Sequence, residues 1–229
     1  MIIPDRYERN IGTITPEEND KLKASWVLVA GCGGLGGHVI EGLARLGVGH
    51  VTAVDGDVFC ASNLNRQLLS TERTLGRHKA LIAQERIKTV NSEVEVHPLC
   101  YYINEENVKG IVTGRYNAVV DALDNIPSRR ILEKSCREQN IPLIHGAIAG
   151  WHGQVSVIWP GDEFFDKIYP PGANKGAEQE TGNPSFTPAM VAAVEVAETV
   201  KLLLGKPQVL RNRLLTIDLL NQEYEIIDL

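Results

Sequence analysis

The sequence contains few cysteines and no cysteine pairs. The four cysteines, Cys32, Cys60, Cys100 and Cys136, are scattered, and no two stand at a Cys-x-x-Cys spacing. This pattern argues against a disulfide framework and against a structural zinc site built on cysteine pairs. We expect reduced thiols that act as small apolar side chains.

Long apolar runs and an excess of positive charge are also missing. No run approaches the roughly 18 apolar residues of a membrane helix, and the first residues lack a signal-peptide core. The 23 basic and 29 acidic side chains give a net charge of −6, which disfavours nucleic acid as a bulk partner. We expect a cytoplasmic protein with no membrane contact, for which nucleic acid binding is an unlikely role.

The composition is that of a globular protein, and strands alternate with helices through the first 150 residues. Hydrophobic residues make up 43% and charged residues 23% of the 229 residues. The expected strands are 26–30, 50–54, 94–96, 117–123 and 141–145, and the expected helices run to 46, over 79–91 and from Pro127. This alternation predicts an α/β fold with a Rossmann-like, doubly wound parallel sheet.

After residue 146 the pattern changes. A strand over 153–159 has no long helix before it, so we expect it to pair antiparallel or at an edge, giving a mixed sheet. Residues 160–187 hold four prolines and four glycines, which predicts a functional or mobile crossover loop. An apolar helix from Pro188 to about Leu204 and a final hairpin follow.

No linker or internal repeat divides the chain. We therefore predict one domain over residues 1–229, with a helical arm at 1–25, an alternating part at 26–150 and a mixed-strand part at 151–229.

The first strand ends in a glycine turn, Gly31-x-Gly33-x-x-Gly36, and the second delivers Asp55. The first glycine permits a tight turn, the second lets backbone N–H groups approach phosphate, and the third lets the helix pack on the strand. Asp55 is placed to accept hydrogen bonds from a ribose. The motif predicts nucleotide binding in residues 26–150, but dinucleotide enzymes and several ATP enzymes share it.

Arg66, Lys79 and Asp124 favour a nucleoside triphosphate. Three phosphates need cationic groups beyond the glycine turn, and Arg66 and Lys79 supply two. Asp124 follows a later strand at the carboxyl edge of the sheet, where it could hold Mg²⁺ or cap the next helix.

This combination resembles the ubiquitin-activating-enzyme-like adenylyltransferases of the ThiF/MoeB/HesA type. The matching segments are Arg6-Tyr7-x-Arg9-Asn10-Ile11, Val27–Gly36, Leu46–Gly49, Asp55-x-Asp57, Ser62–Gln67, Gly76-x-x-Lys79-Ala80, Asp121-x-x-Asp124-Asn125-x-x-x-Arg129, Ile141–Leu143 and Gly153–Val155. Beyond about residue 160, only the Pro188 helix and the hairpin look similar.

The resemblance implies ATP-dependent activation of a carboxylate as an acyl-adenylate with release of pyrophosphate. In this family the acid is usually the C-terminal glycine of a small β-grasp sulfur carrier, and a homodimer is implied because Arg9 matches an arginine that reaches the partner's phosphates. The implied catalytic residues are Arg9, Arg66, Lys79 and Asp124, the last holding Mg²⁺ with ATP. The implied nucleotide-binding residues are Gly31, Gly33, Gly34, Gly36, Asp55, Asp57, Ser62, Asn63, Arg66, Gln67, Lys79, Asp124, Asn125 and Arg129.

The chain departs from many relatives at two places. Phe164 and Lys167 stand where the first zinc-binding cysteine pair would be, and the second pair is missing, so we predict no zinc site. Residues 173–187 contain no cysteine to take the carrier as a thioester. We therefore expect adenylation alone, with sulfur from a separate donor, in cofactor biosynthesis or sulfur transfer.

Three alternatives stay open. First, the same chemistry could act on a small-molecule, peptide or modified-tRNA carboxylate. Second, the glycine motif alone would also suit a nicotinamide oxidoreductase. Third, the chain could be a non-catalytic binding scaffold. The histidines show no metal-ligand spacing in the sequence and predict structural or surface roles.

Overall fold

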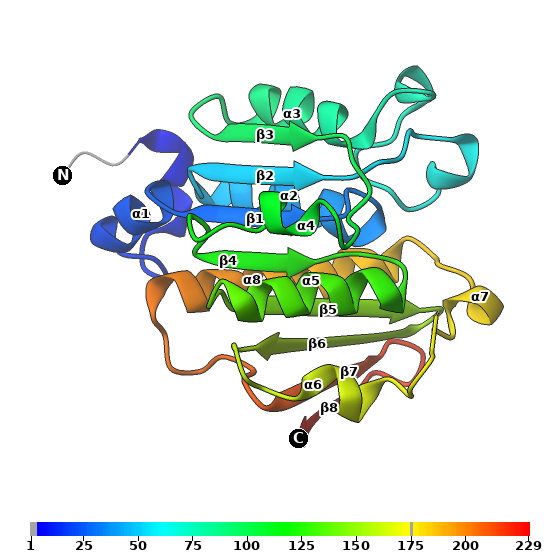
Figure 1. The fold of residues 1–229 in the computed structure, drawn as a ribbon. Helices are drawn as coiled ribbons and strands as arrows, with labels where there is room; N and C mark the ends of the chain where they lie inside the picture. The colour runs from blue at the N-terminus through cyan, green and yellow to red at the C-terminus, as the bar shows by residue number, and fades with distance from the viewer. Residues whose placement is uncertain (1–3, 175) are drawn as a thin grey trace.

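A single eight-stranded sheet organises the computed structural model, which describes residues 4–174 and 176–229 (Figure 1). The strands are β1 Trp26–Ala30, β2 His50–Val54, β3 Glu95–Leu99, β4 Ala118–Asp121, β5 Leu143–Ala149, β6 His152–Ile158, β7 Arg213–Asp218 and β8 Glu223–Asp228. Their order is β3-β2-β1-β4-β5-β6-β7-β8. Strands β1 to β5 pair parallel and β6 to β8 antiparallel, which confirms the predicted mixed sheet.

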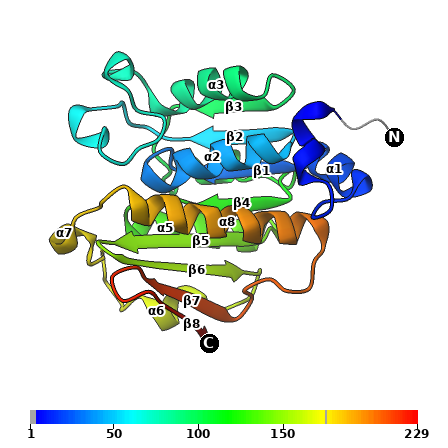
Figure 2. The ribbon, with the colours of Figure 1, turned by 180° about the vertical axis from the view of Figure 1, so that it is seen from behind.

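Helices cover both faces of the sheet. The α-helices are α1 Pro16–Lys23, α2 Gly34–Leu46, α3 Lys79–Val90, α4 Val108–Ile111, α5 Ile126–Glu138, α6 Phe164–Ile168, α7 Glu178–Thr181 and α8 Phe186–Leu204, and the 3-10 helices are η1 Asp5–Asn10, η2 Ala61–Asn63 and η3 Glu72–Thr74. Helices α2, α3 and α8 lie on one face (Figure 2), and α4 and α5 on the other. A separate apolar cluster fills each side.

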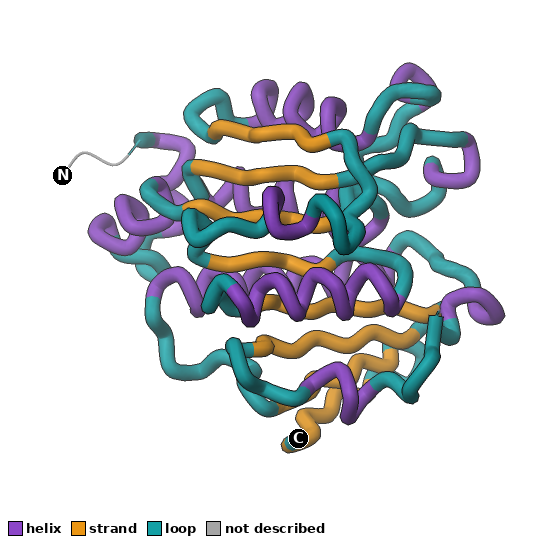
Figure 3. The backbone as a smooth tube through the Cα atoms, in the orientation of Figure 1, coloured by secondary structure: helices purple, strands orange, loops and turns teal. Residues whose placement is uncertain are grey.

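The carboxyl ends of the parallel strands meet at one edge, where Figure 3 shows several of the long loops. The N-terminal arm, η1 and α1, lies at the opposite edge (Figure 1). Tyr7 anchors this arm, because its buried hydroxyl accepts a hydrogen bond from Asn91 Nδ2 at 2.7 Å. Arg9 is therefore exposed at the edge away from the glycine turn.

The crossover segment contains more structure than we predicted. Residues 160–187 hold α6 and α7, and Phe164 and Phe165 are buried in the core beside α5. No helix in the described ranges is both long and apolar enough to cross a bilayer.

Candidate active site

The glycine turn is forced by close backbone packing. Gly31 has φ +96°, and a Cβ there would lie 2.5 Å from the Ala122 carbonyl oxygen. A Cβ at Gly36 would lie 1.8 Å from the Gly31 oxygen, so no larger residue fits. The predicted packing roles of these two glycines are confirmed. Gly33 and Gly34 meet no such obstacle, and α2 begins at Gly34 with its N–H groups at the carboxyl edge.

Four side chains form an acid–base cluster beside this turn. Asp55 accepts hydrogen bonds from the backbone N–H groups of Cys32 (2.7 Å) and Asp57 (2.8 Å). Lys79 Nζ lies 2.9 Å from Asp57 Oδ2, and the Tyr102 hydroxyl donates to Asp57 Oδ1 at 2.5 Å. Lys79 is the first residue of α3, and its buried ammonium is held by the Asp57 carboxylate.

The pKa values of the two aspartates are shifted in opposite directions. Burial raises the pKa of Asp55, although the Lys79 charge and two backbone N–H groups oppose it. Burial acts the same way on Asp57, but the hydrogen bonds from Lys79 and Tyr102 hold its pKa below the ordinary value. Asp57 is therefore the lysine's counter-ion, and Asp55 the acceptor nearest the glycine turn.

Residues 62–67 form a tight turn that presents Arg66. Asn63 is buried, and its side-chain oxygen accepts from the Cys60 N–H at 3.1 Å. The Arg66 guanidinium donates to the Ser62 carbonyl at 3.0 Å and to Asn65 Oδ1 at 2.9 Å. Gln67 packs against Gly33, 3.6 Å from the position of a Cβ there.

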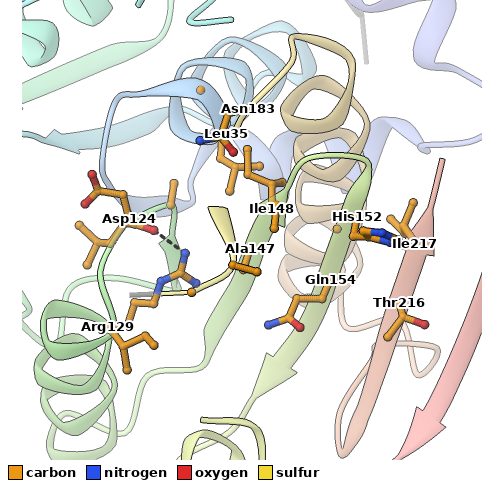
Figure 4. A pocket seen from close by; sticks show the side chains of 18 of the residues that line it. Leu35, Asp124, Arg129, Ala147, Ile148, His152, Gln154, Asn183, Thr216 and Ile217 are labelled. Atoms are coloured by element: carbon orange, nitrogen blue, oxygen red, sulfur yellow. Dashed lines mark hydrogen bonds between the residues drawn. The ribbon is translucent and has the colours of Figure 1, made fainter. Parts of the chain in front are cut away.

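Asp124, Asn125 and Arg129 follow β4 at the same edge. Asn125 caps α5, since its side chain accepts from the Ser128 N–H at 2.9 Å, and Pro127 lies in the first turn as predicted. The capping role therefore belongs to Asn125 and leaves the exposed Asp124 carboxylate available for a ligand. Arg129 is buried and donates to the Leu123 carbonyl, seen as the dashed line in Figure 4.

A buried polar network supports Arg129. Its guanidinium lies 3.4 Å from Asp121 Oδ2 and donates to the Gly146 carbonyl at 2.9 Å, while His145 Nδ1 lies 2.8 Å from the same Asp121 oxygen. Burial favours the protonated acid, but Arg129 and His145 hold the pKa of Asp121 below its ordinary value. Burial lowers the pKa of His145, which is neutral near pH 7.

A cavity of about 490 Å³ joins this edge to the antiparallel strands (Figure 4). This volume is typical of a ligand site. Gly34, Arg66, Asp124, Asn125 and Arg129 line it at one end. Residues of β5 to β8 and of the crossover segment also line the cavity: Ala147, Ala149, His152, Gly153, Gln154, Tyr169, Asp218, Glu223 and Glu225.

The other expected residues lie outside the cavity wall. Asp55, Asp57 and Lys79 form the neighbouring cluster described above, and Ser62 and Asn63 belong to the turn that carries Arg66. Gly31, Gly33 and Gly36 shape the glycine turn. Arg9, in η1, is exposed and does not line this cavity within its own chain.

Several residues of the cavity and of the neighbouring cluster were not predicted. Tyr102 lies on a loop whose approach to Asp57 depends on tertiary packing. The cavity residues His152 and Asp218 lie in β6 and β7, and Tyr169 lies in the crossover segment, with no motif in common. The segment Gly153-Gln154-Val155 was a signal for Gln154, which donates to the Tyr169 hydroxyl at 3.1 Å.

The cysteines offer no buried nucleophile. Burial raises the pKa of Cys32, inside the glycine turn, and of Cys136. Cys60 is exposed, and a hydrogen bond with Ser62 lowers its pKa. Phe164, at the place of a zinc ligand in many relatives, instead packs edge-on against His145, with ring centroids 5.3 Å apart.

These features define an α/β nucleotide-binding enzyme whose cavity runs from a glycine turn to an antiparallel hairpin. The chain belongs to the ThiF family, whose model matches residues 7–229. It is 36% identical over 228 residues to a SAMP-activating enzyme E1 of Haloferax volcanii, covering 97% of this chain and 84% of that protein. It is also 36% identical over 232 residues to a sulfur carrier protein adenylyltransferase of Thermus thermophilus, covering 96% and 85%.

The fold has close counterparts among solved structures. E. coli MccB with ATP superposes with a TM-score of 0.83 at 23% identity, covering 99% of this chain and 72% of that one. The family resemblance and the Rossmann-like mixed sheet expected from the sequence are therefore confirmed. As a member of this family, the protein is an adenylyltransferase, which decides against the oxidoreductase and scaffold alternatives.

Proposed function

We propose that this adenylyltransferase activates the C-terminal glycine of a small ubiquitin-like sulfur carrier with ATP, forming an acyl-adenylate and releasing pyrophosphate. One observation carries the proposal: a single cavity connects Arg66 and Asp124 at the nucleotide edge with β5, β6 and β7 at the other end. The names of the two relatives above support the choice of carrier as substrate.

The nucleotide end suits adenosine and three phosphates. The N–H groups at the start of α2 point to where the phosphates would lie, and Asp55 stands where a ribose hydroxyl would donate. Arg66 and Lys79 supply positive charge. Lys79 would exchange its contact with Asp57 for one with a phosphate oxygen.

Asp124 fits the requirement of Mg²⁺ for hard oxygen ligands. Asp124 is exposed and lines the cavity, and within the described ranges its carboxylate receives only a long contact of 3.3 Å from Asn125 Nδ2. Mg²⁺ is usually held by one or two carboxylates together with substrate phosphates. When bound, the ion would neutralise phosphate charge, and Asp124 would hold it.

The far end suits a thin, extended peptide tail. Ala147, Ala149 and Gly153 line the cavity along β5 and β6, so part of its wall there is made of small residues. A terminal Gly-Gly segment needs no side-chain pocket and can lie along such a wall. Its carboxylate would then reach the α-phosphorus from the side opposite the leaving pyrophosphate.

The reaction asks the protein mainly for positioning and positive charge. The carrier carboxylate attacks the α-phosphorus, the new acyl–phosphate bond forms and the bond to pyrophosphate breaks, with negative charge moving onto the leaving group. Arg66 and Lys79 stabilise that charge. We propose that Arg9 adds a third cation from the partner of a homodimer, because in its own chain it is exposed on η1 and does not line the cavity.

Exchange of radiolabelled pyrophosphate into ATP tests the proposal. The carrier is sought as a small protein ending in Gly-Gly that co-purifies with the native enzyme. Exchange should require this carrier and should be lost when its last glycine is deleted. Exchange with a small carboxylate but not with the carrier would overturn the substrate assignment, and no exchange with any acid would overturn adenylation.

A further inference from the structure

A second cluster of chemically active side chains lies at the edge of the sheet away from the cavity. His50 is the first residue of β2, and Glu95 and His97 are the first and third residues of β3. His50 is the register partner of Glu95, and His97 stands two residues further along the same strand. Side chains two residues apart share a face, so all three project from the same side of the sheet.

This side of β2 and β3 has little cover. In Figure 1, α5 lies in front of the sheet at β4 and β5, whereas β2 and β3 lie above it, and these two strands begin at the end of the sheet where the N-terminal arm lies. Accordingly the Glu95 side chain is 67% exposed, while the histidine side chains are 26% and 42% exposed.

The three donor atoms converge. His50 Nδ1 lies 3.4 Å and His97 Nε2 3.8 Å from the same oxygen, Glu95 Oε2, and all three donors lie within 4.8 Å of one another. In a tetrahedral site with metal–ligand bonds of 2.0–2.2 Å, neighbouring donors are about 3.4 Å apart. The two nitrogen–oxygen distances are too long for good hydrogen bonds, and they are close to the distance between neighbouring donor atoms around one metal ion.

The two ring nitrogens that face Glu95 are buried without hydrogen bonds to the described residues. Both His50 Nδ1 and His97 Nε2 are shielded from solvent, and neither has a hydrogen-bond partner in the part of the chain that the structure describes. Leaving a buried polar atom unpaired costs about 1–3 kcal/mol. Among the residues described, Glu95 makes its close contacts with basic side chains to these two histidines, so no lysine or arginine there takes its charge.

Aromatic stacking holds the imidazoles in place. The Trp26 and His50 rings stack with centroids 4.0 Å apart at 6°, and His97 lies 5.2 Å from Trp26 at 12°. The Arg115 guanidinium sits 5.4 Å from the Trp26 ring centroid. Because the rings are already held in position, less side-chain entropy is lost when a ligand binds.

We propose that His50, Glu95 and His97 bind one divalent transition metal ion of the Zn²⁺ type, with water in the remaining position. Two imidazoles and a carboxylate are ligands that Zn²⁺ accepts. The ion would tie β2 to β3 at the edge remote from the cavity, so its role is structural. Sequence spacing did not reveal the site because its ligands meet across two strands. The proposal therefore departs from the sequence predictions of no zinc site and of structural or surface roles for the histidines.

Metal titration of the full chain, after treatment with a chelator, tests the site. Calorimetry with Zn²⁺ should give one ion per chain, and Co²⁺ should give a visible ligand-field band without a thiolate charge-transfer band. Zn²⁺ should also raise the melting temperature. Loss of an outer-shell partner alone weakens metal binding by 10–100-fold, so Glu95→Gln and His97→Asn should each weaken it by more than about 100-fold.

His38→Asn, on α2, is the matched control and should bind like the unchanged protein. Glu95→Gln alters an exposed side chain, so loss of folding is not an expected explanation for lost binding. Pyrophosphate exchange should be unaffected by either ligand variant, which separates this site from the proposed reaction. Absence of saturable binding, a thiolate band, or undiminished affinity in Glu95→Gln and His97→Asn would overturn the proposal.

Discussion

Replacing Lys79 with methionine should separate its role in catalysis from its role in folding. The Lys79 side chain is 7% exposed and its partner Asp57 is 47% exposed, with 2.9 Å between ammonium and carboxylate. Because half of Asp57 faces solvent, we expect this pair to contribute no more than about 1 kcal/mol to folding. A charge-assisted hydrogen bond to a phosphate is worth about 1.5–3 kcal/mol. At 1.36 kcal/mol per factor of ten, Lys79→Met should slow pyrophosphate exchange about 10- to 150-fold.

Two measurements on the same variant check this reasoning. Exchange kinetics at saturating carrier give the loss of activity, and denaturant unfolding gives the loss of stability. Lys109→Met is the matched control, since that side chain is 71% exposed on α4 and should leave both unchanged. Exchange within twofold of the unchanged enzyme, in a folded Lys79→Met variant, would refute a phosphate contact for this lysine.

Three further predictions concern burial and assembly. Burial raises the pKa of Glu195 well above 4.5. The folded state therefore keeps a proton that the unfolded state has lost. As a result, the free energy of unfolding falls as pH rises, by at most about 1.4 kcal/mol per pH unit. Glu195→Gln removes this slope and should gain stability relative to the unchanged protein between pH 5 and 8; parallel stability–pH curves would contradict this. Phe164→Ala should lower the free energy of unfolding by about 3 kcal/mol, because Phe164 is 5% exposed, whereas Phe186→Ala, at 39% exposed, should cost clearly less; equal losses in denaturant titrations would count against the packing argument. Mixing inactive Arg9→Ala and Asp124→Ala chains should restore part of the exchange activity if sites are shared in a dimer, and confirmed mixed dimers without activity would remove Arg9 from the partner's site.

Local patterns predicted the strands and the glycine turn well. Strands β1 and β2 have the predicted bounds because each is a short apolar run closed by glycine or aspartate. The need for glycine at positions 31 and 36 follows from backbone approaches that the motif spacing implies. In contrast, β5 continues past His145 to Ala149, since pairing with β6 holds Gly146 and its neighbours in the sheet where the apolar run has weakened.

Side-chain clusters that form between distant elements could not be predicted in this way. The Asp121–His145 contact joins residues 24 positions apart, and Tyr102 reaches Asp57 across 45. The helix α6 forms where Phe164 and Phe165 find an apolar surface, which the proline-rich sequence around it does not reveal. In each case the partner is supplied by tertiary packing.

A crystal structure of the protein with Mg²⁺ and a non-hydrolysable ATP analogue tests the central claim most directly. We predict the ribose beside Asp55, the phosphates between the glycine turn and the Arg66 and Lys79 cations, and the α-phosphorus facing the cavity along β5 and β6. A nucleotide bound elsewhere, or phosphates out of reach of both cations, would contradict the assignment of this edge as the adenylation site.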